Sequence, residues 1–305
     1  MKQLYKDIWK AIIKNKKITI LTHINADGDT VGSAVALKQL ILTNTSGIDV
    51  KISGEKVPAY LSLFDENDIV SDEYFNNSQI VVVDTSNKKR VFDKRLVTKE
   101  AIKIDHHHEE EEWLLGVGGD HWPATGEVLY NLAQANNLDI SKRTRAAIFV
   151  AIWTDTEGLT QRNFTDKTKK ILESLDVDKK MIINSLKAPR KIMQLTKSLK
   201  KKMVISNNVG YLYYDETEVD NDYLRLITGE LSNMSGFDVY FGMVKTDKHM
   251  FRGSIRSKIN FDVSKFAKML HGGGHFNSAG FSEQNLDVVT DVLRLIKEEL
   301  AQNKL

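Results

Sequence analysis

Cysteine is absent from this sequence of 305 residues. Its absence excludes disulfide bonds and thiolate metal ligands, so any bound metal must be held by histidine nitrogens and oxygen atoms. It is also compatible with a reducing cytoplasm, which is where we expect the protein to act.

Long hydrophobic runs are absent as well. No stretch approaches the roughly 20 apolar residues that a membrane span needs. The opening segment, MKQLYKDIWKAIIKNKK, interrupts its apolar residues with lysines, unlike the apolar core of a signal peptide. We therefore expect a soluble protein without a membrane partner.

The net charge is small, +2, although 28% of the residues are charged. This net charge argues neither for nor against a nucleic-acid partner. Only a local cluster of charged residues of one sign could indicate one. The length exceeds what a single hydrophobic core usually supports, so two domains are expected.

The first half of the sequence alternates short apolar strands with helices. KITILTH, VKIS, QIVVVDT and AIKIDHH have strand character, and residues 3–15 and 30–44 have helical periodicity. This order predicts an α/β fold in which an N-terminal domain, residues 1–185, holds a parallel sheet with helices on both faces. A basic helical linker, residues 186–203, and a smaller α+β domain, residues 204–305, are expected to follow.

Histidines and aspartates follow the apolar strands, at the carboxyl ends where open α/β sheets bind ligands. Each has another explanation, since Asp29 could cap the next helix and Asp84 could pair with Arg90. The same chemistry recurs at three strand ends, however, which favours one shared site. The candidate metal ligands are His23, Asp27, Asp29, Asp84, His106 and Asp155.

These six residues offer two nitrogens and four carboxylates, more than one ion would use. Two divalent ions that share one carboxylate would use them all, and such pairs activate water for phosphoryl transfer. Oxygen donors favour Mn²⁺ or Mg²⁺, while imidazole leaves Co²⁺ and other transition metals open. Asp105, beside two histidines, could fix the orientation of an imidazole ring.

The C-terminal domain contains a glycine run, HGGGH. Its glycines could present successive backbone N–H groups to an anion, and a histidine, an arginine or a serine could donate to phosphate. A glycine run is more often a tight turn, so this prediction depends on the metal site. The predicted phosphate-binding residues are Arg256, Ser257, Gly272, Gly273, Gly274 and His275.

Seven basic residues and no acidic one lie from Lys187 to Lys202. They could follow a nucleic-acid backbone. Apolar residues such as Leu195 and Leu199 recur there at helical spacing, so a packed helix with solvated lysines is the favoured interpretation. Pro189 is expected to break or restart the helix.

In their order, HINADGD, VVVDT, DHH, TDT, RS and GGGH resemble the motifs of the DHH phosphoesterases that carry a DHH-associated C-terminal domain. In length the chain is similar to the branch of oligoribonucleases and phosphoadenosine-phosphate phosphatases. The resemblance implies a hydrolase with two Mn²⁺ ions that acts on short RNA or DNA oligonucleotides, or on nucleotide phosphates, held between two domains. A homodimer is left open.

The resemblance also implies a role for each residue. One ion would be held by His23, Asp27 and Asp84, and the other by Asp29, Asp84, His106 and Asp155, with Asp84 as the bridge. Asp105 would orient a histidine, and His107 would contact the scissile phosphate or assist the leaving group. The second domain would bind the substrate through Arg256, Ser257 and His275.

Three other functions stay open. A manganese inorganic pyrophosphatase shares the metal motifs, although GGGH and RS count against it. A phosphodiesterase of linear or cyclic dinucleotides would use the same site. A nucleotide-binding module without turnover is also conceivable, although every expected ligand is present.

The stretch IDHHHEEEEW continues beyond the DHH motif with residues that the resemblance does not explain. We expect His108 and Glu109–Glu112 to form a solvated loop at the mouth of the site. Otherwise their charge would act as a filter on anionic substrates.

Overall fold

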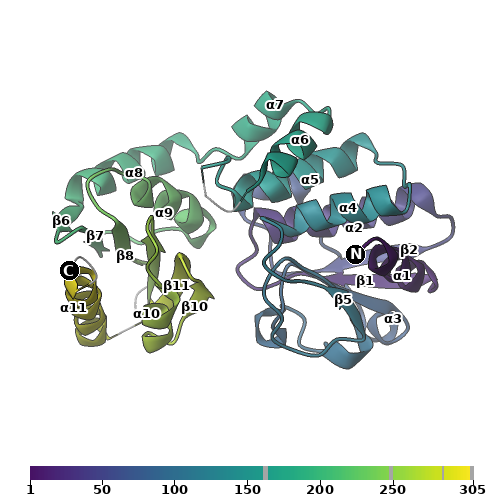
Figure 1. Cartoon of the computed structure of the whole chain (residues 1–305), viewed down its shortest axis with the longest axis horizontal. Coiled ribbons are helices and arrows are strands. Elements are labelled where there is room, and N and C mark those ends of the chain that lie inside the picture. The colour runs from purple at the N-terminus through teal and green to yellow at the C-terminus, as the bar shows by residue number, and fades with distance from the viewer. Residues whose placement is uncertain (161–163, 247–249, 284, 303–305) are drawn as a thin grey trace. The chain divides into compact units, whose positions relative to one another are not determined.

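The computed structural model describes residues 1–160, 164–246, 250–283 and 285–302. The chain divides into two compact units, Met1–Lys187 and Ala188–Leu305. Figure 1 shows both units.

The N-terminal unit is built on a parallel sheet, as predicted, and the sheet has five strands. In sheet order its strands are β2 (Asp49–Ser53), β1 (Lys17–Leu21), β3 (Gln79–Val83), β4 (Ile102–Ile104) and β5 (Leu115–Val117). The edge strand β5 was not predicted, because a three-residue strand directly after a glutamate run carries almost no pattern.

Helices cover both faces of this sheet. In Figure 1, α2 (Gly28–Asn44), α4 (Thr125–Ala135) and α5 (Lys142–Asp155) lie above it, and α3 (Asp72–Asn76) lies below. The remaining helices of the unit are α1 (Lys2–Ile13), α6 (Asp166–Ser174) and α7 (Lys179–Ser185), and its 3₁₀ turns are η1 (Ala59–Phe64), η2 (Lys88–Arg90) and η3 (Thr98–Glu100).

Close packing of α2 on α5 sets the positions of two acidic residues. A Cβ atom on Gly32 would lie 2.6 Å from the carbonyl oxygen of Ala147, and one on Gly28 would lie 2.2 Å from Oγ1 of Thr154. The two helices can approach this closely only because these positions lack a side chain. The beginning of α2 therefore lies against the end of α5, which is Asp155.

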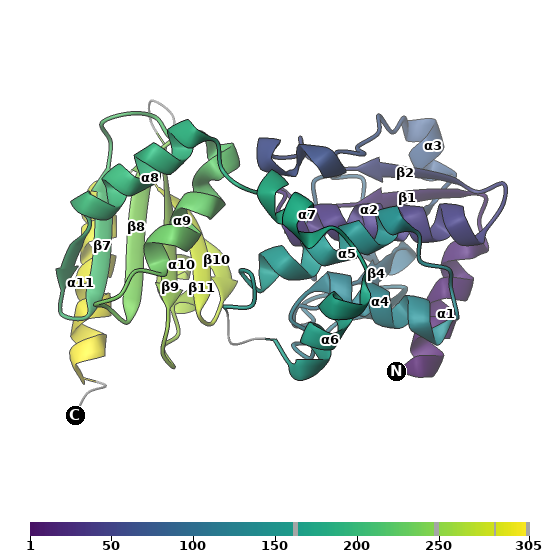
Figure 2. The same ribbon diagram turned by 90° about the horizontal axis from the view of Figure 1, so that it is seen from above.

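The C-terminal unit is a six-stranded mixed sheet. Its order is β10 (Gly273–His275), β11 (Ser278–Glu283), β9 (Phe251–Ser257), β8 (Val239–Lys245), β7 (Val209–Tyr214) and β6 (Val204–Ser206). Two hydrophobic clusters lie on its opposite faces, one under α8 (Arg190–Lys202) and α9 (Leu224–Ser232), the other under α10 (Ser264–Met269) and α11 (Leu286–Gln302). Figure 2 shows these helices around the sheet, and a short 3₁₀ turn, η4 (Asn221–Tyr223), precedes α9.

The basic segment forms a helix of the C-terminal unit. Pro189 precedes α8 and separates it from α7, as expected. Leu199 is fully buried in the core of this unit, with Leu195 packed against the same cluster. The division between units falls after Lys187, so α8 packs as part of the second unit and not as a separate linker.

None of the helices in the described ranges is both long enough and apolar enough to span a lipid bilayer.

Candidate metal centre

All six candidate ligands lie in one cluster in the N-terminal unit. The order of the parallel strands reverses between β1 and β3, and in open α/β sheets the crevice at such a point is where ligands bind. His23, Asp84 and His106 follow β1, β3 and β4. The ends of two helices supply the rest, with Asp27 and Asp29 at the beginning of α2 and Asp155 at the end of α5.

His23, Asp27 and Asp84 form one set of converging ligand atoms. Nε2 of His23 is 3.7 Å from Oδ2 of Asp27 and 3.4 Å from Oδ2 of Asp84. Nδ1 of His23 lies 2.9 Å from the carbonyl oxygen of Ile24, to which it can donate. That hydrogen bond leaves Nε2 as the ring nitrogen directed at the carboxylates.

Asp29, His106 and Asp155 form a second set. Nε2 of His106 is 3.7 Å from Oδ2 of Asp29 and 3.5 Å from Oδ2 of Asp155. Nδ1 of His106 lies 3.2 Å from the carbonyl oxygen of Trp122, so this ring is oriented in the same way as that of His23.

Asp84 connects the two sets. Its Oδ2 faces His23, while its Oδ1 lies 3.5 Å from Nε2 of His106. The backbone of Asp84 has φ 60°, in the left-handed region that non-glycine residues seldom adopt. These contacts exclude the alternative that Asp84 pairs with Arg90, which is exposed on η2.

The cluster gathers negative charge where water is excluded. Burial raises the pKa of Asp84 and of Asp29 well above the usual range, and neighbouring carboxylates raise both further. Burial lowers the pKa of His106, but the charges of Asp155, Asp29 and Asp84 outweigh it, so the net direction is upward. Divalent cations would offset this repulsion, and the nitrogen and oxygen donors fit them.

The beginning of α4 holds the carboxylates in place, which the sequence did not suggest. The backbone N–H groups of Thr125 and Gly126 donate to Asp29 at 2.7 and 3.0 Å, and Oγ1 of Thr125 donates to Oδ1 of Asp84 at 3.0 Å. Free N–H groups at a helix N-terminus commonly bind anions.

Asp105 and His107 form a hydrogen-bonded pair beside the cluster. Nδ1 of His107 donates to Oδ1 of Asp105 at 2.7 Å, and the same oxygen accepts from the backbone N–H of His106 at 2.8 Å. Burial would raise the pKa of Asp105, but this hydrogen bond and the charges of His107 and His106 lower it. Asp105 thus contacts the ring of His107, and its orienting role stays a prediction.

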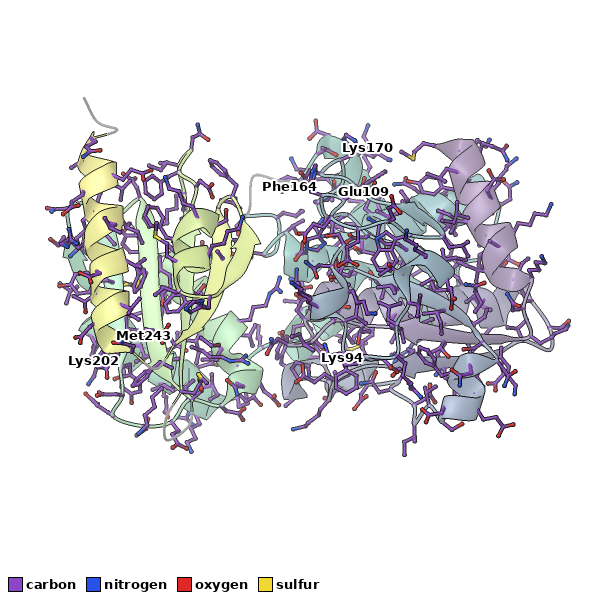
Figure 3. All side chains as sticks on the ribbon, turned by 90° about the horizontal axis from the view of Figure 1, so that it is seen from below. Lys94, Glu109, Phe164, Lys170, Lys202 and Met243 are labelled. Atoms are coloured by element: carbon purple, nitrogen blue, oxygen red, sulfur yellow. The ribbon has the colours of Figure 1, made fainter. Side chains whose placement is uncertain are left out.

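The glutamate run is attached to its surroundings residue by residue. Glu110 accepts from the Asn87 side chain at 2.6 Å, and Glu111 accepts from the backbone N–H of Lys88 at 3.2 Å. Glu112 pairs with Lys99 at 2.9 Å. Glu109, labelled in Figure 3, lies 3.7 Å from the ammonium of a lysine in β4. His108, Glu109, Glu110 and Glu112 are exposed to solvent, as expected, and these polar contacts connect the loop to its surroundings.

In the C-terminal unit, the predicted phosphate-binding residues lie on adjacent strands. Arg256 on β9 is paired in register with Ser278 on β11, which is paired with His275 on β10. Gly273 and Gly274 are part of β10, and the N–H of Gly272 donates to the carbonyl of Ala267 at 2.8 Å, so the glycines do not form three free donors. The predicted role of the His275 side chain lies outside what the structure describes.

Two family models match the chain. Residues 17–152 match the N-terminal domain of the DHH family, and residues 208–302 match the DHHA1 domain.

Individual relatives cover nearly the whole chain. A probable bifunctional oligoribonuclease and PAP phosphatase NrnA of Streptococcus mutans is 26% identical over 97% of this chain and 99% of its own length. The bifunctional oligoribonuclease and PAP phosphatase NrnA of Mycoplasma genitalium is 24% identical, over 94% and 96%. An exopolyphosphatase-related protein of Bacteroides fragilis has a similar fold, with a TM-score of 0.83 and 19% identity over 99% of this chain and 98% of that one.

Proposed function

Because the chain belongs to the DHH family and carries a DHHA1 domain, we propose that it hydrolyses short oligonucleotides to mononucleotides in a metal-dependent reaction. The chain is a hydrolase of phosphoester bonds, as its relatives are named. Short RNA or DNA is the proposed substrate, and 3′-phosphoadenosine 5′-phosphate is a second one, because the relatives are named as bifunctional.

The observation that carries this proposal is the position of Asp84 between two sets of ligands. Each set combines an imidazole Nε2 with carboxylate oxygens. Oδ2 of Asp84 faces His23, and Oδ1 faces His106, with Nδ1 of His107 3.7 Å from the same Oδ1. A single structural ion would not need a carboxylate shared between two histidines.

Two Mn²⁺ ions are the proposed cofactors, with Mg²⁺ or Co²⁺ as substitutes. Asp84 would be shared, His23 and Asp27 would complete one site, and Asp29, His106 and Asp155 would complete the other. When bound, the ions supply Lewis acidity, which lowers the pKa of water and offsets charge on phosphate oxygens.

The other side chains would bind the substrate and move a proton. The Asp105 carboxylate holds Nδ1 of His107, which leaves Nε2 of His107 to contact the scissile phosphate or to protonate the leaving oxygen. In the C-terminal unit, Arg256 and Ser257 would donate to substrate phosphate, with the glycine strand β10 near them in the sheet.

The deciding experiment offers the purified protein several substrates in parallel, each with Mn²⁺. They are a labelled RNA of a few nucleotides, the matching DNA, 3′-phosphoadenosine 5′-phosphate, a cyclic dinucleotide, a linear dinucleotide and pyrophosphate. We expect mononucleotides from the short RNA or DNA, and no release after chelation of the metal.

Each other outcome supports a different function. Turnover of pyrophosphate alone would assign the chain to the inorganic pyrophosphatases. Turnover restricted to cyclic or linear dinucleotides would narrow the substrate class within the same site. Binding of nucleotides without any hydrolysis would reduce the protein to a nucleotide-binding module.

A further inference from the structure

Lys103 is a fully buried lysine, two residues before Asp105 in the chain. It lies at the centre of β4, between Ile102 and Ile104, and no part of it is exposed to solvent. Its Nζ is one of the buried atoms for which the described residues provide no hydrogen-bond partner. An ammonium in such a place costs free energy unless a nearby negative charge compensates it.

Two carboxylates supply that compensation. Nζ of Lys103 lies 3.9 Å from Oδ2 of Asp105 and 3.7 Å from Oε1 of Glu109. Oδ2 of Asp105 is also buried, and the described residues provide no hydrogen-bond donor for it. The ammonium is thus the cation next to the oxygen of Asp105 that does not contact His107.

The surrounding structure makes room for this ammonium. A Cβ atom on Gly118 would lie 2.7 Å from Nζ of Lys103, and one on Gly116 would lie 3.0 Å from its Cβ. The Trp113 ring lies 6.0 Å from Nζ, and Trp113 packs against an apolar cluster that includes Val82, the register partner of Lys103. An uncharged side chain of similar length would suit these neighbours, so packing alone does not account for a lysine.

We infer that Lys103 is a positioning residue. Its ammonium holds Oδ2 of Asp105, so that Oδ1 stays directed at Nδ1 of His107 and the imidazole keeps the orientation needed at the phosphate. The inference rests on the role of His107 in the proposed function. Glu109 lies on the solvent side of the same ammonium, with its side chain 63% exposed, and has no part in holding Asp105.

The central variant is Lys103→Met, which keeps the length of the side chain and removes the charge. Its matched control is Glu109→Gln, which removes the other carboxylate beside the ammonium and leaves Asp105 in place. We expect Lys103→Met to lower kcat for a short RNA by about tenfold or more, the usual effect of losing an outer-sphere partner. KM and Mn²⁺ affinity should stay within about twofold, and Glu109→Gln should resemble the wild type.

A second measurement does not depend on activity. In metal-free protein labelled with ¹⁵N-histidine, the Nδ1–H proton of His107, assigned with His107→Gln, should resonate at low field because it is bonded to Asp105. We expect this resonance to move or disappear in Lys103→Met and to persist in Glu109→Gln. If the wild type hydrolyses none of the substrates, the proposed function fails, while this spectrum still tests the position of the ring.

Two outcomes would overturn the inference. One is a Lys103→Met protein with the kcat and the His107 resonance of the wild type. The other is an equal loss of kcat in Glu109→Gln, which would mean that Lys103 acts through the acidic loop and not through Asp105. If Lys103→Met does not fold, Gly118→Ala displaces the ammonium without removing it, and it should lower kcat and move the resonance in the same direction.

Discussion

Oδ1 of Asp84 lies 3.5 Å from Nε2 of His106, while Oδ2 of the same carboxylate lies 3.4 Å from Nε2 of His23. One carboxylate thus lies between the imidazole that follows β1 and the imidazole that follows β4. If two ions occupy the site, every other ligand serves one of them, and Asp84 alone serves both.

Replacement of Asp84 should therefore impair both metal sites. We expect Asp84→Asn to reduce kcat for a short RNA at least about a thousandfold, which corresponds to about 4 kcal/mol of barrier. Titration with Mn²⁺ should show weaker binding at both positions. The matched control is Asp139→Asn, a change of an exposed aspartate between α4 and α5. Near-normal rates in Asp84→Asn would rule out a shared carboxylate.

Thr125 should matter for catalysis without being a ligand. Its Oγ1 donates to Oδ1 of Asp84, and its backbone N–H donates to Asp29. Thr125→Val keeps the shape and the N–H but removes the hydroxyl, so Asp84 loses one orienting bond. We expect kcat to fall about tenfold, the scale of outer-sphere contacts around metals, with the circular dichroism spectrum unchanged. An unchanged kcat would mean that the strand ends hold Asp84 without help.

A shared site for His23, Asp84 and His106 could be predicted from sequence because each follows an apolar strand, and parallel strands bring their carboxyl ends together. The contact of Thr125 with Asp84 could not be predicted, because a threonine at the start of a helix is expected to cap that helix. Nothing in the local sequence indicates that it reaches Asp84.

Lys103 was also beyond prediction, since a lysine between two isoleucines in a strand is expected to face solvent. It is buried because β5 pairs alongside β4 and Trp113 packs nearby, and β5 itself has too little pattern to predict. The contacts of the glutamate run could not be predicted either. Their partners, Asn87, Lys88 and Lys99, become neighbours only after the sheet has formed.

The approach of α2 to α5 should make Gly32 intolerant of any side chain. Gly32→Ala would place a Cβ atom 2.6 Å from the carbonyl oxygen of Ala147 and 2.9 Å from the backbone nitrogen of Ala151, and backbone atoms cannot easily move. We expect the free energy of unfolding to fall by about 2 kcal/mol or more, measured by urea denaturation.

Gly229 provides the control for Gly32. It lies in α9, and a Cβ atom there would have no neighbour within 4 Å. Gly229→Ala should therefore be neutral or stabilise the protein by up to about 1 kcal/mol, because alanine loses less backbone entropy in a helix than glycine does. Equal destabilisation by both substitutions would contradict the close contact between α2 and α5.

Asp93 should make stability depend on pH in the acid range. It is buried, and burial would raise its pKa, but hydrogen bonds from Arg95 and Ser53 lower the pKa below the usual value. Because the folded pKa lies below the unfolded one, its carboxylate stabilises the fold above the unfolded pKa of about 3.9. That contribution is lost as the pH falls through the folded pKa.

Asp93→Asn tests this sign directly. At neutral pH the variant should be less stable than the wild type by about 2 kcal/mol, the scale of hydrogen bonds to a charged group. The difference in unfolding free energy should shrink as the pH falls below about 4, because the wild type then loses the charge that the variant never had. A difference that stays constant from pH 7 to pH 3 would show that Asp93 acts through its shape and not through its charge.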